Sequence, residues 1–206
     1  MGYSLFIDSS DNLTLGLLDE KMKWVEFKTM ASRKSSGVFH GLIEELLSLN
    51  GTDIFGLERV FYAAGPGSYT GIRLVEGFSQ ILRWRGIETN SFYLFETPKI
   101  LGVESGIWVS EAYKGELFLY DWDKDSTSTK LLKKEDALDY LSEKNEKLFS
   151  LNKIDDLDTS LVLELLEESP EKVFSDIKER NLNRDPFYYR SIENEFTKPK
   201  IVKGRL

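Results

Sequence analysis

Apolar residues alternate with polar ones along the first thirty positions, and this pattern predicts three short strands. An apolar run at residues 3–7 ends at Asp8, and turn-forming residues occupy positions 9–12. Alternation continues at 13–18 and again at 22–29, as expected for strands with one face in a core. The chain is therefore expected to open as an antiparallel β-hairpin that a third strand extends.

Two helices flank a fourth strand in the next sixty residues. Ser35-Ser36 can cap the first helix, and Asn50-Gly51 is suited to end it. Its apolar positions recur at helical spacing: Phe39, Leu42, Ile43, Leu46 and Leu47. Residues 59–64 have the pattern of a buried strand, and a second helix is predicted from the following glycine-rich segment to about Arg85.

The second helix is expected to have two distinct faces. Helical spacing predicts a core stripe of Leu74, Phe78 and Ile81, with Val75 and Leu82 at its edge. About 100° away lie Arg73, Gly77 and Trp84. Glycine inside a helix costs about 1 kcal/mol relative to alanine, but it allows another backbone to approach closely. The partner of this second face is either the first helix of the same chain or another subunit.

The rest of the chain is more charged. Strand-like runs follow at 87–94, 106–112 and 116–122. A short helix is predicted at 95–101, a polar loop at 126–129, and longer helices at 134–144 and 160–168. This order predicts an α/β fold with mixed sheets. We expect the two lobes to comprise residues 1–104 and 105–206.

Composition removes several kinds of chemistry. The 206 residues include no cysteine, which excludes thiol nucleophiles, thiolate zinc sites, iron–sulfur clusters and disulfides. His40 is the single histidine, and its place among apolar helix positions favours a packing or surface role. The absence of a signal-peptide pattern and of a membrane-length apolar run predicts a cytoplasmic protein with no membrane partner.

The charge of the chain argues against direct nucleic-acid binding. The 27 basic and 35 acidic residues give a net charge of −8, whereas phosphate contact needs a positive surface. The one basic patch is at the C-terminus: Lys198, Lys200, Lys203 and Arg205. This tail is either a frayed, solvated terminus or an arm that contacts phosphate.

A glycine-rich block carries the strongest signal. It lies between a strand and a helix and reads Gly65-Pro66-Gly67-Ser68-Tyr69-Thr70-Gly71-Ile72-Arg73. Glycines let a backbone approach a ligand closely, and the N–H groups of a helix start attract anions. The block matches neither a Walker loop nor a dinucleotide fingerprint. It is therefore either a nucleotide-proximal loop or a tight turn with Ser68 or Thr70 as its cap.

Asp8 is the other candidate for chemistry in the first lobe. It ends the first strand and faces a turn. A carboxylate at this point can hold a metal-bound water, or it can simply close an Asx turn.

The block at residues 65–73 resembles the Gly-Pro-Gly-Ser-Phe-Thr-Gly-Leu-Arg block of the TsaB (YeaZ) family. Ile7-Asp8-Ser9-Ser10 is similar to that family's Ile-Asp-Thr-Ser. Residues 111–118 resemble its Asp-Ala-Arg-Arg-Gly-Glu-Val-Tyr, and 186–190 its late Pro-x-Tyr-Leu-Arg. The resemblance extends over almost the whole chain.

The resemblance implies the two-lobed actin-like ATPase fold, in which each lobe is ribonuclease H-like. It implies a noncatalytic subunit in the formation of threonylcarbamoyladenosine at position 37 of tRNAs that read codons starting with A. The partners would be a TsaD-like catalytic subunit and a TsaE-like ATPase, with tRNA contacted through the complex. The subunit would require no cofactor or metal of its own, ATP or ADP would bind within the complex, and the free chain could form a homodimer.

The two helices of the first lobe correspond to those that pack against TsaD or a second TsaB copy. The predicted partner-facing residues are Phe39, Leu42, Ile43, Arg73, Gly77, Gln80 and Trp84. Two positions depart from the family. Ser35-Ser36-Gly37 stands where His-Ser-Glu is usual, so His40 is not the family histidine, and Tyr113 replaces an arginine.

Two rival hypotheses make the chain an enzyme. A degenerate sugar-kinase-like ATPase would use Asp8 and the loop from Gly65 to Arg73. It would also need a second phosphate loop, yet no Asp-x-Gly occurs between Gly102 and Trp122. A peptidase would need a nucleophile triad or a metal cluster, neither of which this composition supports. We therefore expect no catalytic residues in this chain.

Overall fold

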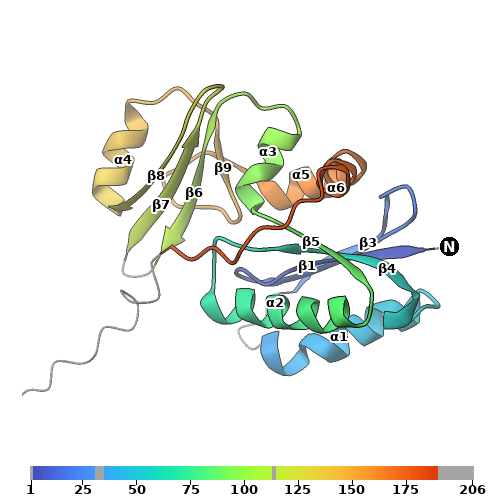
Figure 1. Ribbon diagram of the computed structural model, residues 1–206. Helices are drawn as coiled ribbons and strands as arrows, with labels where there is room; N and C mark the ends of the chain where they lie inside the picture. The colour runs from blue at the N-terminus through green and yellow to red at the C-terminus, as the bar shows by residue number, and fades with distance from the viewer. Residues whose placement is uncertain (1, 31–34, 113–114, 190–206) are drawn as a thin grey trace, which may run out of the picture.

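The computed structural model describes residues 2–30, 35–112 and 115–189, which form two lobes built on separate sheets (Figure 1). Each sheet has five strands, in the orders β3-β2-β1-β4-β5 and β10-β9-β6-β7-β8. Each holds three antiparallel strands followed by two that run parallel to its first strand. The predicted two-lobed α/β class with mixed sheets is confirmed.

The first sheet is enclosed between two pairs of helices. Its strands are β1 (Tyr3–Asp8), β2 (Leu13–Leu18), β3 (Trp24–Met30), β4 (Leu57–Ala63) and β5 (Glu88–Phe92). One face carries α1 (Ser35–Leu49) and α2 (Tyr69–Trp84). The short 3-10 turn η1 (Ile54–Gly56) joins α1 to β4. The opposite face carries α5 (Val162–Glu168) and α6 (Pro170–Glu179), as Figure 1 shows.

The second sheet has a shorter helical cover. Its strands are β6 (Gly106–Ala112), β7 (Glu116–Trp122), β8 (Thr127–Lys133), β9 (Leu148–Ser150) and β10 (Thr159–Leu161). One face packs on α4 (Lys134–Ser142). The link from the first sheet consists of η2 (Leu94–Glu96) and α3 (Thr97–Ile100).

One aromatic core joins the two lobes. Phe174 of α6 lies 5.4 Å from Phe6 and 4.9 Å from Phe61, measured between ring centroids. The same core continues into the second sheet through Trp108 and Trp122. Helices encoded after the second sheet therefore complete the first one. All strands of each sheet lie on one side of residue 104, but the placement of a domain boundary there stays a prediction.

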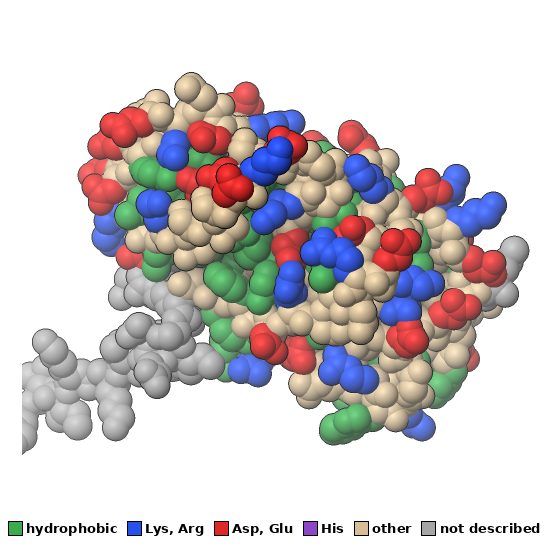
Figure 2. Space-filling view, turned by 45° about the horizontal axis from the view of Figure 1, so that its top comes forward, with side chains coloured by type: hydrophobic (Ala, Val, Ile, Leu, Met, Phe, Trp, Pro, Cys, Tyr) green, Lys and Arg blue, Asp and Glu red, His purple; other side chains and the backbone are tan. Residues whose placement is uncertain are grey.

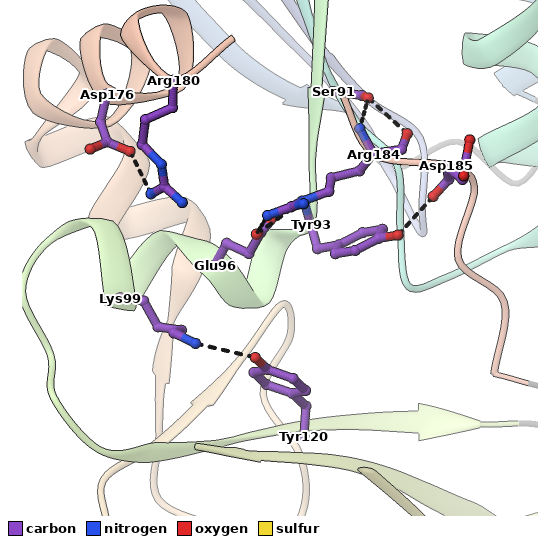
Figure 3. Close-up of polar contacts among 9 residues, drawn as sticks. All are labelled: Ser91, Tyr93, Glu96, Lys99, Tyr120, Asp176, Arg180, Arg184 and Asp185. Carbon is purple, nitrogen blue, oxygen red and sulfur yellow. Dashed lines mark hydrogen bonds and ion pairs between the residues drawn. The ribbon is translucent and has the colours of Figure 1, made fainter. Parts of the chain in front are cut away.

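The last described residues, 182–189, cross both lobes, and we call them the C-terminal strap. The strap runs beside β5, where the N–H of Ser91 donates to the carbonyl of Leu182 at 3.1 Å. Arg184 forms an ion pair with Glu96, and the Tyr93 hydroxyl donates to the Asp185 carbonyl at 3.0 Å (Figure 3). These bonds cover the edge of β5 and tie the end of the chain to the link between the lobes.

Three predictions about local structure are wrong. Residues 126–129, expected as a polar loop, belong largely to β8, because this exposed strand pairs with β7 on one side and keeps polar side chains. Helix α6 was not expected, since only a few apolar positions separate its charged residues. The core stripe of α2 is shifted, and its buried members are Gly71, Ile72, Val75, Ser79 and Leu82.

The shift in α2 has a clear cause. Ser79 is fully buried, so a polar residue interrupts the apolar stripe that faces the sheet. Ile81, predicted to be in the core, is 54% exposed, while Leu74 and Phe78 pack at the edge of the core. The hydrophobic spacing therefore predicted a core face of α2 that is rotated by part of a turn from the observed one.

Replacing Phe174 with alanine should lower the free energy of unfolding by about 3–5 kcal/mol, because a buried phenyl ring is lost. Urea titrations followed by tryptophan fluorescence and by far-ultraviolet circular dichroism would measure this loss. The two signals should change together, since Trp24 and Trp122 report from different lobes of one core. The largely exposed Phe55→Ala is the control. A loss below about 1 kcal/mol, or two separate transitions, would contradict the shared core.

Candidate functional site

The glycine-rich loop packs against the turn between β1 and β2. The N–H of Ser68 donates to the carbonyl of Ser10 at 2.6 Å. Ser68 is also the N-cap of α2, because its hydroxyl accepts from the N–H of Gly71 at 3.4 Å. Thr70 lies within the first turn of α2, and so the cap is Ser68 rather than Thr70. The loop thus anchors the start of α2 to the end of β1.

The glycines of this loop lie so close to other backbone segments of the same chain that a side chain would not fit. A Cβ on Gly67 would lie 2.4 Å from the Ser10 carbonyl oxygen, and one on Gly71 would lie 1.7 Å from that of Ser9. Gly65 has a φ of +110°, and a Cβ there would lie 2.5 Å from the carbonyl of Phe187 in the strap. Close chain packing is thus sufficient to require glycine at these three positions.

Asp8 is buried beneath the same turn. Its Oδ1 accepts from the N–H of Ser10 at 2.8 Å and from the Ser10 hydroxyl, as in an Asx turn. Its Oδ2 has no hydrogen-bond partner among the described residues. Burial raises the pKa of Asp8 from 3.8 to about 6, more than the bonds from Ser10 lower it. The carboxyl therefore closes the turn and is 1% exposed.

A cleft of about 380 Å³ lies between the lobes. The first lobe contributes Asp11 and Ser68, and the second contributes Glu111 and Lys153. Tyr189 of the strap also lines it, and burial raises the pKa of its hydroxyl to about 12. Among the described residues of this lining, two carboxylates accompany one ammonium group, which is unfavourable for a nucleotide phosphate. Asp8 does not line the cleft.

The described residues contain no group of three or more side chains that could hold a metal ion. No described helix is long and apolar enough to cross a membrane. His40 lies exposed on α1, with its ring 5.5 Å from that of Phe78. Figure 2 shows acidic and basic side chains interspersed over the visible face, without a broad basic surface.

The outer surface of α1 and α2 is the second candidate site, and we call it the helical face. Trp84 is 83% exposed at the end of α2, and Ile81 is exposed three residues earlier. Val38 is exposed near the start of α1, so each helix presents an apolar side chain to solvent. Arg73 and Gln80 are exposed on α2 as well. Residues 73, 77, 80 and 84 share one side of the helix because they are three or four apart.

Two residues predicted to contact a partner are instead in the core. Phe39 is fully buried and Ile43 nearly so, because both point from α1 toward the sheet. Leu42 is half-buried at the edge of the same cluster. These side chains support the helical face from within, and the exposed set is Arg73, Gly77, Gln80 and Trp84.

Two exposed glycines on this face differ from those of the loop. A Cβ added to Gly41 of α1 or to Gly77 of α2 would meet nothing within 4 Å. The described chain therefore gives no packing reason for either glycine, although each weakens its helix by about 1 kcal/mol. A close approach by the backbone of another molecule is a physical reason for glycine at these two positions.

The strap is the part of the site that sequence patterns missed. Tyr188 packs on Tyr69 with ring centroids 5.0 Å apart, and Tyr189 lines the cleft. Only the resemblance at 186–190 drew attention to this segment, because an extended chain with irregular contacts has no periodicity. Tyr113 and the basic tail, Lys198 to Arg205, lie outside the described residues.

Comparison with solved structures identifies a similar fold. No protein-family model and no curated protein matches the sequence. YeaZ from Pseudomonas aeruginosa has a TM-score of 0.55 and 16% identity, covering 89% of this chain and 99% of that chain. An uncharacterized protein "with similarity to peptidase YEAZ" from the same organism has a TM-score of 0.56 and 16% identity, covering 91% and 100%. The fold is therefore YeaZ-like over nearly its full length.

Asp8→Asn should stabilise the protein at pH 7.5 by about 1–3 kcal/mol and have little effect near pH 4. The raised pKa means that the folded chain keeps a proton that the unfolded chain has lost. Wild-type stability should therefore fall as pH rises from about 4 to above 6. Asparagine keeps the acceptor for Ser10 without a buried charge.

Urea denaturation at several pH values would test this expectation, with the exposed Asp125→Asn as control. Parallel pH profiles for wild type and Asp8→Asn would contradict it.

Alanine at two glycines of α2 should have opposite effects. Gly71→Ala should lower the free energy of unfolding by at least about 2 kcal/mol, because its Cβ would collide with backbone. Gly77→Ala should raise it by about 0.5–1 kcal/mol, because the helix gains propensity and the space is open. Thermal and urea unfolding of the two variants would measure both changes. A destabilised Gly77→Ala would show that Gly77 serves the isolated chain.

Proposed function

We propose that this chain is a noncatalytic scaffold and activator subunit in threonylcarbamoyl transfer to adenosine 37 of tRNAs that read codons starting with A. It would dock on a TsaD-like catalytic subunit through the helical face. The proposal rests on the sequence resemblance at residues 65–73 and on the YeaZ-like fold. A TsaE-like ATPase would join the pair, and tRNA would be contacted through the complex.

The observation that carries the proposal is that each helix of the helical face has an open glycine in its interior, Gly41 in α1 and Gly77 in α2. Gly41 and Gly77 weaken α1 and α2 without relieving any contact within the described chain. Trp84 exposes a large aromatic side chain on the same surface. Aromatic residues and close backbone approach are features of stable helix–helix interfaces. A partner that covers this surface would account for both the weakened helices and the exposed tryptophan.

The chemistry of the cleft favours a supporting role over catalysis. Asp8 is held in its turn, and the loop glycines are occupied by the chain's own backbone. The described part of the cleft lining has an excess of carboxylates over cations, which is unfavourable for triphosphate. We therefore propose that this subunit needs no cofactor of its own, and that ATP or ADP acts elsewhere in the complex. When alone, the chain would pair with a second copy through the same face.

Gly77→Leu should abolish docking while leaving the fold intact, because the side chain would project from the helical face into the space a partner occupies. Size-exclusion chromatography with light scattering would compare wild type and variant, each mixed with the TsaD-like protein of the same organism. Lys178→Leu is the matched control, since it adds an exposed leucine to α6, away from this face. Equal heterodimer formation by wild type and Gly77→Leu would contradict the assigned face.

Failure of the wild type to associate, with the TsaE-like protein and ATP present, would contradict the proposed function. The ATPase hypothesis would then be tested by hydrolysis assays. ATP turnover by the pure chain that Asp8→Ala abolishes would support an enzyme, provided that the variant remains folded.

A further inference from the structure

Arg73 is held in an unusual setting at one end of the helical face. Its guanidinium carbon lies 5.7 Å from the ring centroid of Tyr69, one turn earlier on α2. The same carbon lies 5.7 Å from the ring centroid of Tyr188 in the C-terminal strap. The two rings are themselves 5.0 Å apart. Contacts from two distant segments thus fix the position of an exposed, flexible side chain.

Arg73 also has no acidic partner in the part of the chain that the structure describes. Three other arginines do form ion pairs: Arg59 with Glu88, Arg180 with Asp176 and Arg184 with Glu96. A guanidinium carries five N–H donors in its plane, and ring contacts engage the group without supplying a counter-charge. Arg73 is therefore positioned and exposed without an ion pair. The carboxylate of Glu76, three residues later on α2, is engaged by Tyr62 and Gln80 instead.

The location of Arg73 connects it to docking. It shares one side of α2 with Gly77, Gln80 and Trp84, so a partner that covers these residues would also reach it. Burying a guanidinium without a counter-charge is costly, because the cation loses its hydration. A partner that docks here must therefore supply an anion at this point.

We propose that Arg73 receives a carboxylate side chain of the docked partner protein, in a charge-assisted and preferably bidentate pair. This inference rests on the proposed docking function and adds the chemistry by which the partner is selected. Glu76 on α2 and Glu44 and Glu45 on α1 lie on the same helices. A single carboxylate fits one isolated cation in such surroundings, whereas a nucleic-acid backbone would be repelled.

The two tyrosines would make this pair selective for arginine. They hold the planar group in place before docking, so less side-chain entropy is lost when the pair forms. Lysine has no plane to stack and offers only a point charge on a flexible stem. Arg73→Lys should therefore behave more like Arg73→Gln than like wild type.

The test measures affinity for the TsaD-like protein of the same organism by isothermal titration at several salt concentrations. Arg73→Gln and Arg73→Lys should weaken binding by roughly 10- to 100-fold, and the salt dependence should become flatter. Arg180→Gln is the matched control, since that arginine lies on α6 and already has a partner. Thermal unfolding of each variant would identify any loss of affinity that comes from a loosened strap.

A double-mutant cycle would identify the receiving group. Partner carboxylates would be changed to amides one at a time, and one of them should lose its effect in the Arg73→Gln background. Unchanged affinity of Arg73→Gln for the partner would overturn the inference while docking itself stands. A loss confined to tRNA retention by the assembled complex would also overturn it, in favour of a phosphate ligand. Absence of any wild-type association would instead overturn the proposed function and this inference with it.

Discussion

The ring of Phe174 lies against aromatic side chains from β1, β4 and β5, and this contact completes the first sheet. Parallel strands need cover on both faces, since neither face can be left in water. Helices α1 and α2 supply one cover, and α6 supplies the other from the far end of the sequence. The two lobes are therefore parts of one folded unit with a continuous aromatic core.

This constraint also shapes the candidate sites. The loop before α2 is fixed between the turn after Asp8 and the strap, so the start of the helix has little freedom. The start of α2 is consequently fixed within the helical face. The open glycines Gly41 and Gly77 lower helix stability on this face and relieve no contact within the described chain. A fixed helix start also holds Arg73 in position, which makes recognition by this cation more selective.

Local patterns predicted much of this architecture from the sequence. Alternation located the opening strands, and helical spacing located α1. The expectation of one buried face was wrong for β1 and β2, which are buried on both faces, and only β3 keeps exposed residues. The core face of α2 was misjudged because buried Ser79 interrupts its stripe. Helix α6 and the strap were missed because their roles depend on partners far away in sequence, as in the contact between Phe174 and Phe6. The glycine block was found, but only the structure shows which glycines touch their own chain.

The strap has a consequence for how the protein is made. Residues 182–189 pair with β5 and contact the loop at Gly65, yet they are translated after every strand of both sheets. Early strands must wait in the cell with one apolar face uncovered while the second half is translated. Rare codons or a chaperone acting between the two halves would therefore influence yield more than equivalent events near the N-terminus. The first lobe is begun early in synthesis but is completed only after the second sheet has been translated.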